Sequence, residues 1–177
     1  MSDQCSNSPT GYPSDCEILE GYRTKARERD SRMNDPHRRC ALAKAKEIKL
    51  LLLDVDGVLT DGNLIYSGSG EESKAFNTQD GFGLRLLREA DIEVGVITAR
   101  QSEVVARRAK ELKMHYIYQG APNKNEAFKD IVKVSGLKPY QIAYMGDDWL
   151  DLVLLQQVGL AIVPANGVPE VKETAHF

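Results

Sequence analysis

Four apolar runs of this 177-residue sequence are each followed by polar side chains that can do chemistry. Carboxylates brought close together raise one another's pKa unless a cation compensates them. Oxygen ligands with this much charge suit Mg²⁺, a hard ion that usually bridges to substrate phosphate. The set therefore predicts magnesium-assisted phosphoryl chemistry. Its members are Asp54, Asp56, Thr98, Lys124, Asp147, Asp148 and Asp151.

The first two acids, Asp54 and Asp56, indicate a division of labour. Alternate residues of a strand point to opposite faces, but both carboxylates can face one site where the strand turns into a loop. One of them can then attack as a nucleophile while the other donates or accepts a proton. Gly57 permits the close backbone approach that a phosphate needs. Thr98 and Lys124 supply a hydroxyl and a point charge for non-bridging phosphoryl oxygens.

The elements that must position these residues alternate between strand and helix from residue 48 onward. Residues 48–55 are almost wholly apolar, as expected of a strand buried on both faces of a parallel sheet. The alternation predicts a doubly wound α/β fold, a three-layer sandwich with a mostly parallel sheet. Such sheets bind ligands at the carboxyl ends of their strands. Further strands are expected at 92–98, 115–118, 141–145 and 160–163, and helices at 83–90, 102–112, 123–134 and 148–157.

A glycine turn at residues 67–70 separates two short strand-like segments, 64–66 and 73–76. This pattern predicts a β-hairpin that protrudes from the sheet. The hairpin carries more apolar surface than a free hairpin should expose, and two strands alone are only marginally stable. Pairing of hairpins from several subunits would bury that surface. Its apolar residues are Leu64, Ile65, Tyr66 and Phe76.

The first forty residues differ in composition from the remainder of the chain. Their only Val, Ile, Leu or Phe residues are Ile18 and Leu19. Such a segment buries too little apolar surface to offset its ordering entropy. We therefore expect residues 1–40 to be a mobile tail and residues 41–177 to form the domain. All three cysteines, Cys5, Cys16 and Cys40, lie in this tail, where we expect free thiols.

Charge and hydropathy argue against several classes of partner. The net charge of −3 gives no argument for a nucleic-acid partner. No apolar run approaches the roughly 20 residues that a membrane span needs. The start of the chain lacks the basic and apolar regions of a secretory signal. We therefore expect a cytoplasmic protein with neither a nucleic-acid nor a membrane partner.

The order and spacing of the polar motifs resemble those of the haloacid dehalogenase-like phosphohydrolase superfamily. More narrowly, five segments resemble the family of 3-deoxy-D-manno-octulosonate 8-phosphate phosphatases. They are residues 53–62 (LDVDGVLTDG), 74–81 (KAFNTQDG), 97–100 (ITAR), 118–120 (YQG) and 144–148 (YMGDD). The resemblance covers residues 41–177. It implies a magnesium-dependent phosphomonoester hydrolase that releases the free sugar acid and phosphate in lipopolysaccharide precursor synthesis.

The resemblance also implies a role for each catalytic residue. Asp54 is the nucleophile that forms an aspartyl-phosphate, and Asp56 is the general acid and base. Thr98 and Lys124 complete the catalytic set. Mg²⁺ would be held by the carboxylates of Asp54 and Asp147 and by the main-chain carbonyl of Asp56.

Supporting acids and substrate contacts follow from the same resemblance. Asp148 and Asp151 would support the metal ligands. Arginines suit a substrate that carries both a carboxylate and a phosphate. The implied substrate-binding residues are Asp56, Asn77, Asp80, Gly81, Arg85, Arg100, Arg108 and Lys124.

The intervals between the motifs indicate that the chain has no lid domain of its own. Thr98 follows Asp56 by 42 residues, and the hairpin, one helix and one strand already fill that interval. Asp147 follows Lys124 by 23 residues, which is enough for one helix and one strand. Something else must then cover a small substrate, and the resemblance implies a homotetramer.

Three other functions fit parts of the pattern. A response-regulator receiver places its acidic pair first, whereas Asp147 and Asp148 come after Lys124 here. Non-catalytic relatives lose the acidic residues that this chain retains. A phosphatase for a nine-carbon keto acid 9-phosphate would share every catalytic residue, and a substrate panel separates it. Family members also continue beyond the position of Phe177 into a glycine-rich tail, so we expect that tail to be missing and selectivity to be weakened.

Overall fold

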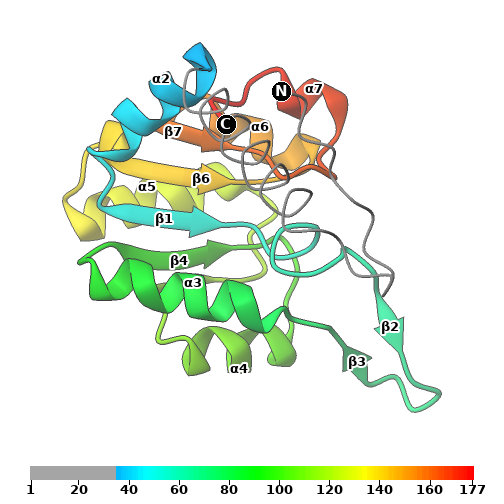
Figure 1. The fold of residues 1–177 in the computed structure, drawn as a ribbon. Coiled ribbons are helices and arrows are strands. Elements are labelled where there is room, and N and C mark those ends of the chain that lie inside the picture. The colour runs from blue at the N-terminus through cyan, green and yellow to red at the C-terminus, as the bar shows by residue number, and fades with distance from the viewer. Residues whose placement is uncertain (1–34) are drawn as a thin grey trace, which may run out of the picture. The chain divides into compact units, whose positions relative to one another are not determined.

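The computed structural model describes residues 35–177, and the folded unit considered below is Ala41–Phe177. Its centre is a sheet of five parallel strands in the order β5-β4-β1-β6-β7 (Figure 1). The chain builds β1, β4 and β5 outward and then returns to place β6 on the other side of β1. The strands are β1 (Leu50–Leu53), β4 (Glu93–Ile97), β5 (Tyr116–Tyr118), β6 (Ile142–Met145) and β7 (Leu160–Ile162).

Helices cover both faces of the sheet, so the predicted three-layer α/β fold is confirmed (Figure 1). One hydrophobic core joins the sheet to α3 and α4, and a second joins it to α5 and α6. The α-helices are α2 (Pro36–Ala45), α3 (Thr78–Glu89), α4 (Glu103–Glu111), α5 (Lys124–Ser135), α6 (Leu152–Leu155) and α7 (Pro169–Lys172). Two 3₁₀ turns, η1 (Pro139–Gln141) and η2 (Trp149–Asp151), precede β6 and α6.

Strand β1 shows why an apolar run forms the middle of this sheet. Its leucines alternate between the two cores, because successive side chains of a strand point to opposite faces. Leu50 and Leu52 pack with α5 and α6, whereas Leu53 packs with α3 and α4. Both faces of β1 are therefore covered, as the sequence predicted for residues 48–55. The acids that follow β1 therefore follow the central strand of the sheet.

The predicted hairpin is present and extends away from the sheet (Figure 1). Strand β2 (Ile65–Tyr66) pairs antiparallel with β3 (Glu72–Ser73). Three consecutive side chains of the first arm are half exposed, at 46–56%. They are Leu64, Ile65 and Tyr66. The hairpin therefore presents an apolar surface in the single chain.

Helix boundaries follow the local capping chemistry. The sequence predicted that α4 begins after Ser102, and the Ser102 hydroxyl accepts the main-chain N–H of Val105. Helix α3 begins at Thr78 instead of residue 83, because Asn77 caps it by accepting the N–H of Gln79 at 2.8 Å. Two short helical segments, η1 and α7, were not predicted, and both begin at a proline.

The expected tail lies mainly outside the described residues, which begin at residue 35. Cys5 and Cys16 lie outside them as well, and Cys40 is an exposed free cysteine. Helix α2 begins at Pro36, five residues before the expected start of the domain. Within residues 35–177, no helix is long and apolar enough to cross a membrane.

Candidate active site

A polar cleft of about 310 Å³ lies at the carboxyl ends of the strands. It gathers side chains from the ends of β1, β4 and β6 and from the start of α5, because parallel strands present their carboxyl ends at one edge. Leu150 of η2 forms part of its wall. The lining residues are Asp54, Asp56, Gly62, Thr98, Ala99, Arg100, Lys124, Asp147, Asp148 and Leu150.

Asp54 and Lys124 form a buried ion pair at the base of this cleft. Lys124 Nζ lies 3.0 Å from Asp54 Oδ1, and the two residues are only 3% and 8% exposed. Burial raises the pKa of Asp54 from its usual 3.8 to about 6, although the Lys124 ammonium opposes that rise. Asp54 is therefore a carboxylate that a cation in the cleft would favour in its ionised form.

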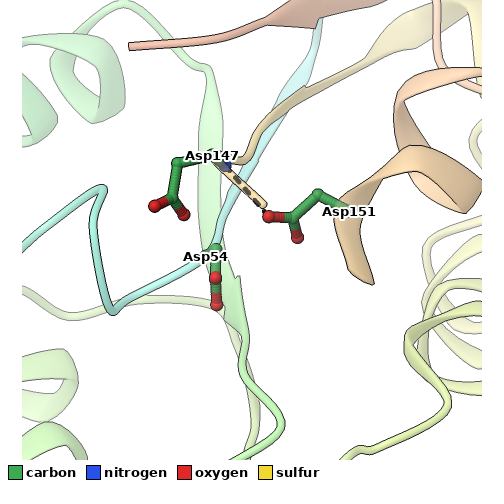
Figure 2. A group of neighbouring side chains, drawn as sticks. All are labelled: Asp54, Asp147 and Asp151. Carbon is green, nitrogen blue, oxygen red and sulfur yellow. Dashed lines mark hydrogen bonds between the residues drawn. The ribbon is translucent and has the colours of Figure 1, made fainter. Parts of the chain in front are cut away.

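Asp151 lies beneath the cleft and is fully buried. Its Oδ1 atom accepts hydrogen bonds from Lys124 Nζ at 2.6 Å and from the Tyr144 hydroxyl at 2.5 Å. Its Oδ2 atom accepts the main-chain N–H groups of Asp147 and Asp148 at 3.0 and 3.1 Å. Figure 2 shows the bond to Asp147. Asp151 thus joins the lysine to the loop after β6.

Three carboxylates of the site lie close enough together to share one metal ion. One oxygen each from Asp54, Asp147 and Asp151 lies within 4.8 Å of the others, and Figure 2 shows the three side chains around one space. Among the described residues, Asp147 Oδ1 is buried without a hydrogen-bond partner. Burial, together with the charge of Asp151, also raises the pKa of Asp147. An uncompensated oxygen beside Asp54 fits a hard cation such as Mg²⁺.

Glycines make room for two of these carboxylates. Gly57 has a φ of +89°, and a Cβ there would lie 1.9 Å from Asp147 Oδ2. A Cβ on Gly146 would lie 2.3 Å from the carboxyl carbon of Asp151. Both distances are far below any van der Waals contact. Gly57 in the sequence DVDG therefore allows the loop after β1 to approach Asp147, and Gly146 allows Asp151 to fold back against the end of β6.

Asp56 lies in a separate cluster of charges at the mouth of the cleft. Lys74 Nζ contacts Asp56 Oδ1, and Arg100 Nε lies 3.7 Å from Asp56 Oδ2. Glu72 Oε1 lies 3.6 Å from the lysine and 3.2 Å from Arg100 Nη2. Hydrogen bonds from Ser102 and Arg100, together with the charge of Lys74, lower the pKa of Glu72. Asp56 is thereby surrounded by two cations.

Lys74 and Glu72 are site residues that the sequence analysis did not select. Both belong to the arm of the hairpin that contains β3, and Lys74 is already part of the segment 74–81 that carries the family resemblance. The sequence feature that could have indicated them is their spacing: residues two apart in a strand, such as Glu72 and Lys74, point to the same face. The hairpin also reaches Arg100 through Tyr66, whose hydroxyl accepts from Arg100 Nη2 at 2.6 Å.

Two of the remaining predicted residues adjoin the cleft. Thr98 is buried at its edge, and its hydroxyl accepts the N–H of Arg100 at 3.4 Å. Asp148 is exposed and caps η2 by accepting the N–H of Trp149 at 2.7 Å. Thr98 therefore supports the turn after β4, and Asp148 supports the turn after β6.

Five of the predicted substrate-binding residues do not line the cleft of the single chain. Asn77 and Asp80 line a groove at the base of the hairpin. Gly81 and Arg85 line another cleft between α3 and α4, and Arg85 pairs with Glu89. Arg108 lies 5.8 Å from the centre of the Phe76 ring. In one chain, only Asp56, Arg100 and Lys124 of the predicted substrate-binding set face the same cleft as Asp54.

The parallel sheet and the acidic cleft have the arrangement found in haloacid dehalogenase-like hydrolases, and the family model with that description matches residues 114–177. The 3-deoxy-D-manno-octulosonate 8-phosphate phosphatase KdsC of Escherichia coli K12 is 44% identical over 128 residues, which cover 72% of this chain and 68% of that protein. The chain therefore belongs to the KdsC family of phosphatases.

Solved structures of the family share the fold. The Yersinia pestis 3-deoxy-D-manno-octulosonate 8-phosphate phosphatase is 39% identical with a TM-score of 0.76, covering 77% of this chain and 74% of that one. The Moraxella catarrhalis enzyme is 41% identical with a TM-score of 0.74, covering 76% and 78%. That structure holds a magnesium ion, a phosphate ion and a KDO molecule.

Proposed function

We propose that this phosphatase hydrolyses 3-deoxy-D-manno-octulosonate 8-phosphate to the free sugar acid and phosphate, as a step of lipopolysaccharide precursor synthesis. The observation that carries the proposal is the buried pair of Asp54 and Lys124 beside the unpartnered oxygen of Asp147. Membership of the KdsC family supports the substrate. The cations around Asp56 and in the cleft match the charges of a phosphorylated sugar acid.

The first step transfers the phosphoryl group to the protein. An Asp54 oxygen forms a bond to phosphorus while the bond between phosphorus and the sugar oxygen breaks. In this step Asp56 begins in its protonated form and gives that proton to the departing sugar oxygen, which leaves Asp56 ionised. Lys124 is 3.0 Å from Asp54 and neutralises charge on the phosphoryl oxygens, and the buried Thr98 adds a hydroxyl donor.

The second step releases phosphate and restores the resting site. Asp56, now ionised, takes a proton from a water molecule that attacks phosphorus. The bond between phosphorus and the Asp54 oxygen breaks, so the carboxylate is regenerated. Positioning and charge neutralisation are the main requirements of such a transition state. Arg100 and Lys74 hold Asp56 at the mouth of the cleft for both proton transfers.

Mg²⁺ is the metal that these residues fit. The carboxylates of Asp54 and Asp147 and the main-chain carbonyl of Asp56 would hold it, with Asp148 and Asp151 as supporting acids. When bound, the ion neutralises phosphate charge and keeps the nucleophilic carboxylate ionised. Asp151 suits a supporting role because both of its oxygens already accept two hydrogen bonds each.

The remaining substrate contacts are proposed to require assembly of several chains. Asn77, Asp80, Gly81, Arg85 and Arg108 lie outside the cleft that contains Asp54. A homotetramer formed through the hairpins would bring such surfaces of one chain towards the substrate of another. A small ligand also needs walls that exclude water, because exposed charges interact weakly.

A substrate panel tests the proposed activity. Release of inorganic phosphate is measured from 3-deoxy-D-manno-octulosonate 8-phosphate, from a nine-carbon keto acid 9-phosphate and from p-nitrophenyl phosphate. We expect kcat/KM to be highest for the octulosonate ester, by at least about tenfold over the nine-carbon ester, because a site that hydrogen-bonds particular hydroxyl groups discriminates strongly against a different chain length and hydroxyl pattern. Preference for the nine-carbon ester would reassign the substrate while leaving the catalytic roles in place.

A further inference from the structure

Tyr144 is a fully buried side chain with a hydroxyl group at the base of the active site. It lies in β6 and packs in the core formed with α5 and α6. A phenol hydroxyl in such a core is unfavourable unless it forms hydrogen bonds, and a phenylalanine would fill nearly the same volume without that cost. The hydroxyl of Tyr144 therefore requires an explanation beyond packing.

The partners of this hydroxyl are both site residues. Tyr144 donates to Asp151 Oδ1 at 2.5 Å and accepts from Lys124 Nζ at 3.3 Å. Lys124 itself donates to the same Asp151 oxygen at 2.6 Å, so the three groups form a closed triangle. An ammonium group has three N–H donors. Two of them go to Asp151 and Tyr144, which leaves the third side of the ammonium group towards Asp54, 3.0 Å away, and the cleft.

We propose that Tyr144 is a positioning residue: its hydroxyl fixes Asp151 and Lys124, and so holds the lysine ammonium against the nucleophilic Asp54. The inference rests on the proposed roles of Asp54 and Lys124. Burial and the nearby charges of Asp151 and Asp54 raise the pKa of Tyr144 well above its usual value. The hydroxyl therefore remains protonated and able to donate. The same Asp151 also binds the Asp147 loop, so one hydroxyl steadies both sides of the site.

Tyr144→Phe is the variant that removes this hydroxyl while conserving the shape of the core. The matched control is Tyr116→Phe, which removes a hydroxyl that donates to Glu93 Oε2 at 3.0 Å. Glu93 is the first residue of β4 and therefore lies at the opposite edge of the sheet from the cleft. Thermal unfolding by circular dichroism establishes that each variant is folded at the assay temperature.

The readout is kcat and KM measured separately on p-nitrophenyl phosphate and on 3-deoxy-D-manno-octulosonate 8-phosphate. For Tyr144→Phe we expect kcat to fall about tenfold, which corresponds to about 1.4 kcal/mol, the range of one hydrogen bond to a charged group. KM should change by less than about twofold, because misplacing Lys124 weakens transition-state stabilisation more than ground-state binding. Tyr116→Phe should retain the kcat of the unmodified enzyme.

A double-mutant cycle with Asp151→Ala separates positioning from packing. Single-turnover assays at high enzyme concentration keep the low rate of Asp151→Ala measurable. Without the Asp151 carboxylate, Tyr144→Phe should slow the reaction by less than about twofold. An unchanged kcat in Tyr144→Phe, or an equal tenfold loss in the Asp151→Ala background, would overturn the positioning role. If only p-nitrophenyl phosphate is hydrolysed and responds as expected, the proposed substrate fails while the role of Tyr144 stands.

Discussion

The ammonium group of Lys74 pairs with Asp56 Oδ1, and the lysine side chain is fully buried in doing so. Lys74 follows strand β3 of the hairpin, whereas Asp56 follows β1 at the centre of the sheet. The hairpin therefore supplies a counter-charge to the proposed general acid and base. Because Glu72 and Tyr66 of the hairpin also bind Arg100, hydrogen bonds connect the hairpin to the edge of the sheet that carries the proposed site.

Removal of this counter-charge should damage catalysis. Lys74→Met leaves Asp56 with Arg100 as its remaining cation within 4 Å among the described residues. We expect kcat to fall by more than about tenfold, because loss of one partner of a largely buried pair is costly and the remaining Arg100 lies 3.7 Å from Asp56. The exposed Lys110→Met is the matched control and should retain full activity. Steady-state kinetics measure kcat of both variants. An unchanged kcat in Lys74→Met would contradict a role of Lys74 in supporting Asp56.

Substitution of Asp54 and substitution of Asp56 should have different effects on the phosphorylated form of the protein. Asp54→Asn should abolish turnover, because an amide neither attacks phosphorus nor supplies an anionic metal ligand. Asp56→Asn should be nearly as damaging, yet it should still accumulate some phosphorylated protein, since the nucleophile remains while proton transfer is lost. Intact-protein mass spectrometry after acid quenching measures that species. Near-normal turnover by Asp54→Asn would refute the nucleophile assignment.

The sequence predicted best the positions of the strands and the meeting of the polar residues that follow their carboxyl ends. The apolar run before Asp54 predicted a strand buried on both faces, and Leu50 and Leu53 do pack in different cores. Parallel strands place their carboxyl ends together whatever their order. The residues that follow those ends, among them Thr98 and Asp147, consequently meet in one cleft.

Contacts made by the hairpin could not be predicted in the same way. Lys74 and Asp56 are 18 residues apart in the sequence and meet only when the hairpin folds back towards the end of β1, which local sequence does not encode. The burial of Tyr144 beside Asp151 depends on the packing of β6 against α5. Arg85 and Arg108 follow family positions, yet the single chain places them outside the cleft that contains Asp54. The apolar hairpin predicts assembly, but it does not indicate which residues of a neighbouring chain would reach the substrate.

Gly57 offers a test of the proposed metal site in which none of the proposed ligand residues is itself substituted. A methyl group there would lie 1.9 Å from Asp147 Oδ2, so Gly57→Ala must displace this carboxylate. We expect the Mg²⁺ concentration for half-maximal activity to rise by about tenfold or more. Gly70→Ala is the control, since Gly70 also has a positive φ but has no atom within 4 Å of the added Cβ. Equal magnesium dependence in the two variants would argue against Asp147 as a ligand.

Metal dependence should follow from the hardness of the ligands. Activity should vanish with EDTA and return on addition of Mg²⁺, and also with Mn²⁺ or Co²⁺. Ca²⁺ should inhibit, because its larger and looser coordination would misplace Asp54 relative to phosphorus. Phosphate release assays with each metal measure this order. Full activity in metal-free buffer would be incompatible with the proposed site.

The pKa of Asp54 predicts how magnesium stabilises the fold at different pH values. This pKa is raised from 3.8 to about 6 in the metal-free protein, so Asp54 contributes stability that is full below about pH 3.8 and lost as the pH rises through about 6. Mg²⁺ binds the ionised carboxylate and competes with the proton. The increase in Tm caused by Mg²⁺ should therefore be large at pH 7.5 and small at pH 5. Thermal unfolding with and without Mg²⁺ at both pH values measures this increase. An equal increase in Tm at pH 5 and pH 7.5 would contradict the prediction.

Assembly through the hairpin should control activity. Ile65 and Tyr66 are 54% and 56% exposed in the single chain. Complete burial of a fully exposed apolar side chain is worth about 1.5–3 kcal/mol, so burial of the exposed part of each residue is worth roughly half of that. Ile65→Asp should therefore convert the proposed tetramer at micromolar concentration into smaller species and lower kcat in parallel, because neighbouring chains would no longer cover the substrate. Tyr66→Asp should have the same effect on assembly, but it also removes the hydroxyl that binds Arg100, so Ile65→Asp is the cleaner variant.

Val134→Asp, at an exposed apolar residue of α5, is the control and should leave both the assembly and kcat unchanged. Multi-angle light scattering at the assay concentration measures the mass. A fully active monomer would refute the link between assembly and activity and would leave the assignments of Asp54 and Asp56 intact.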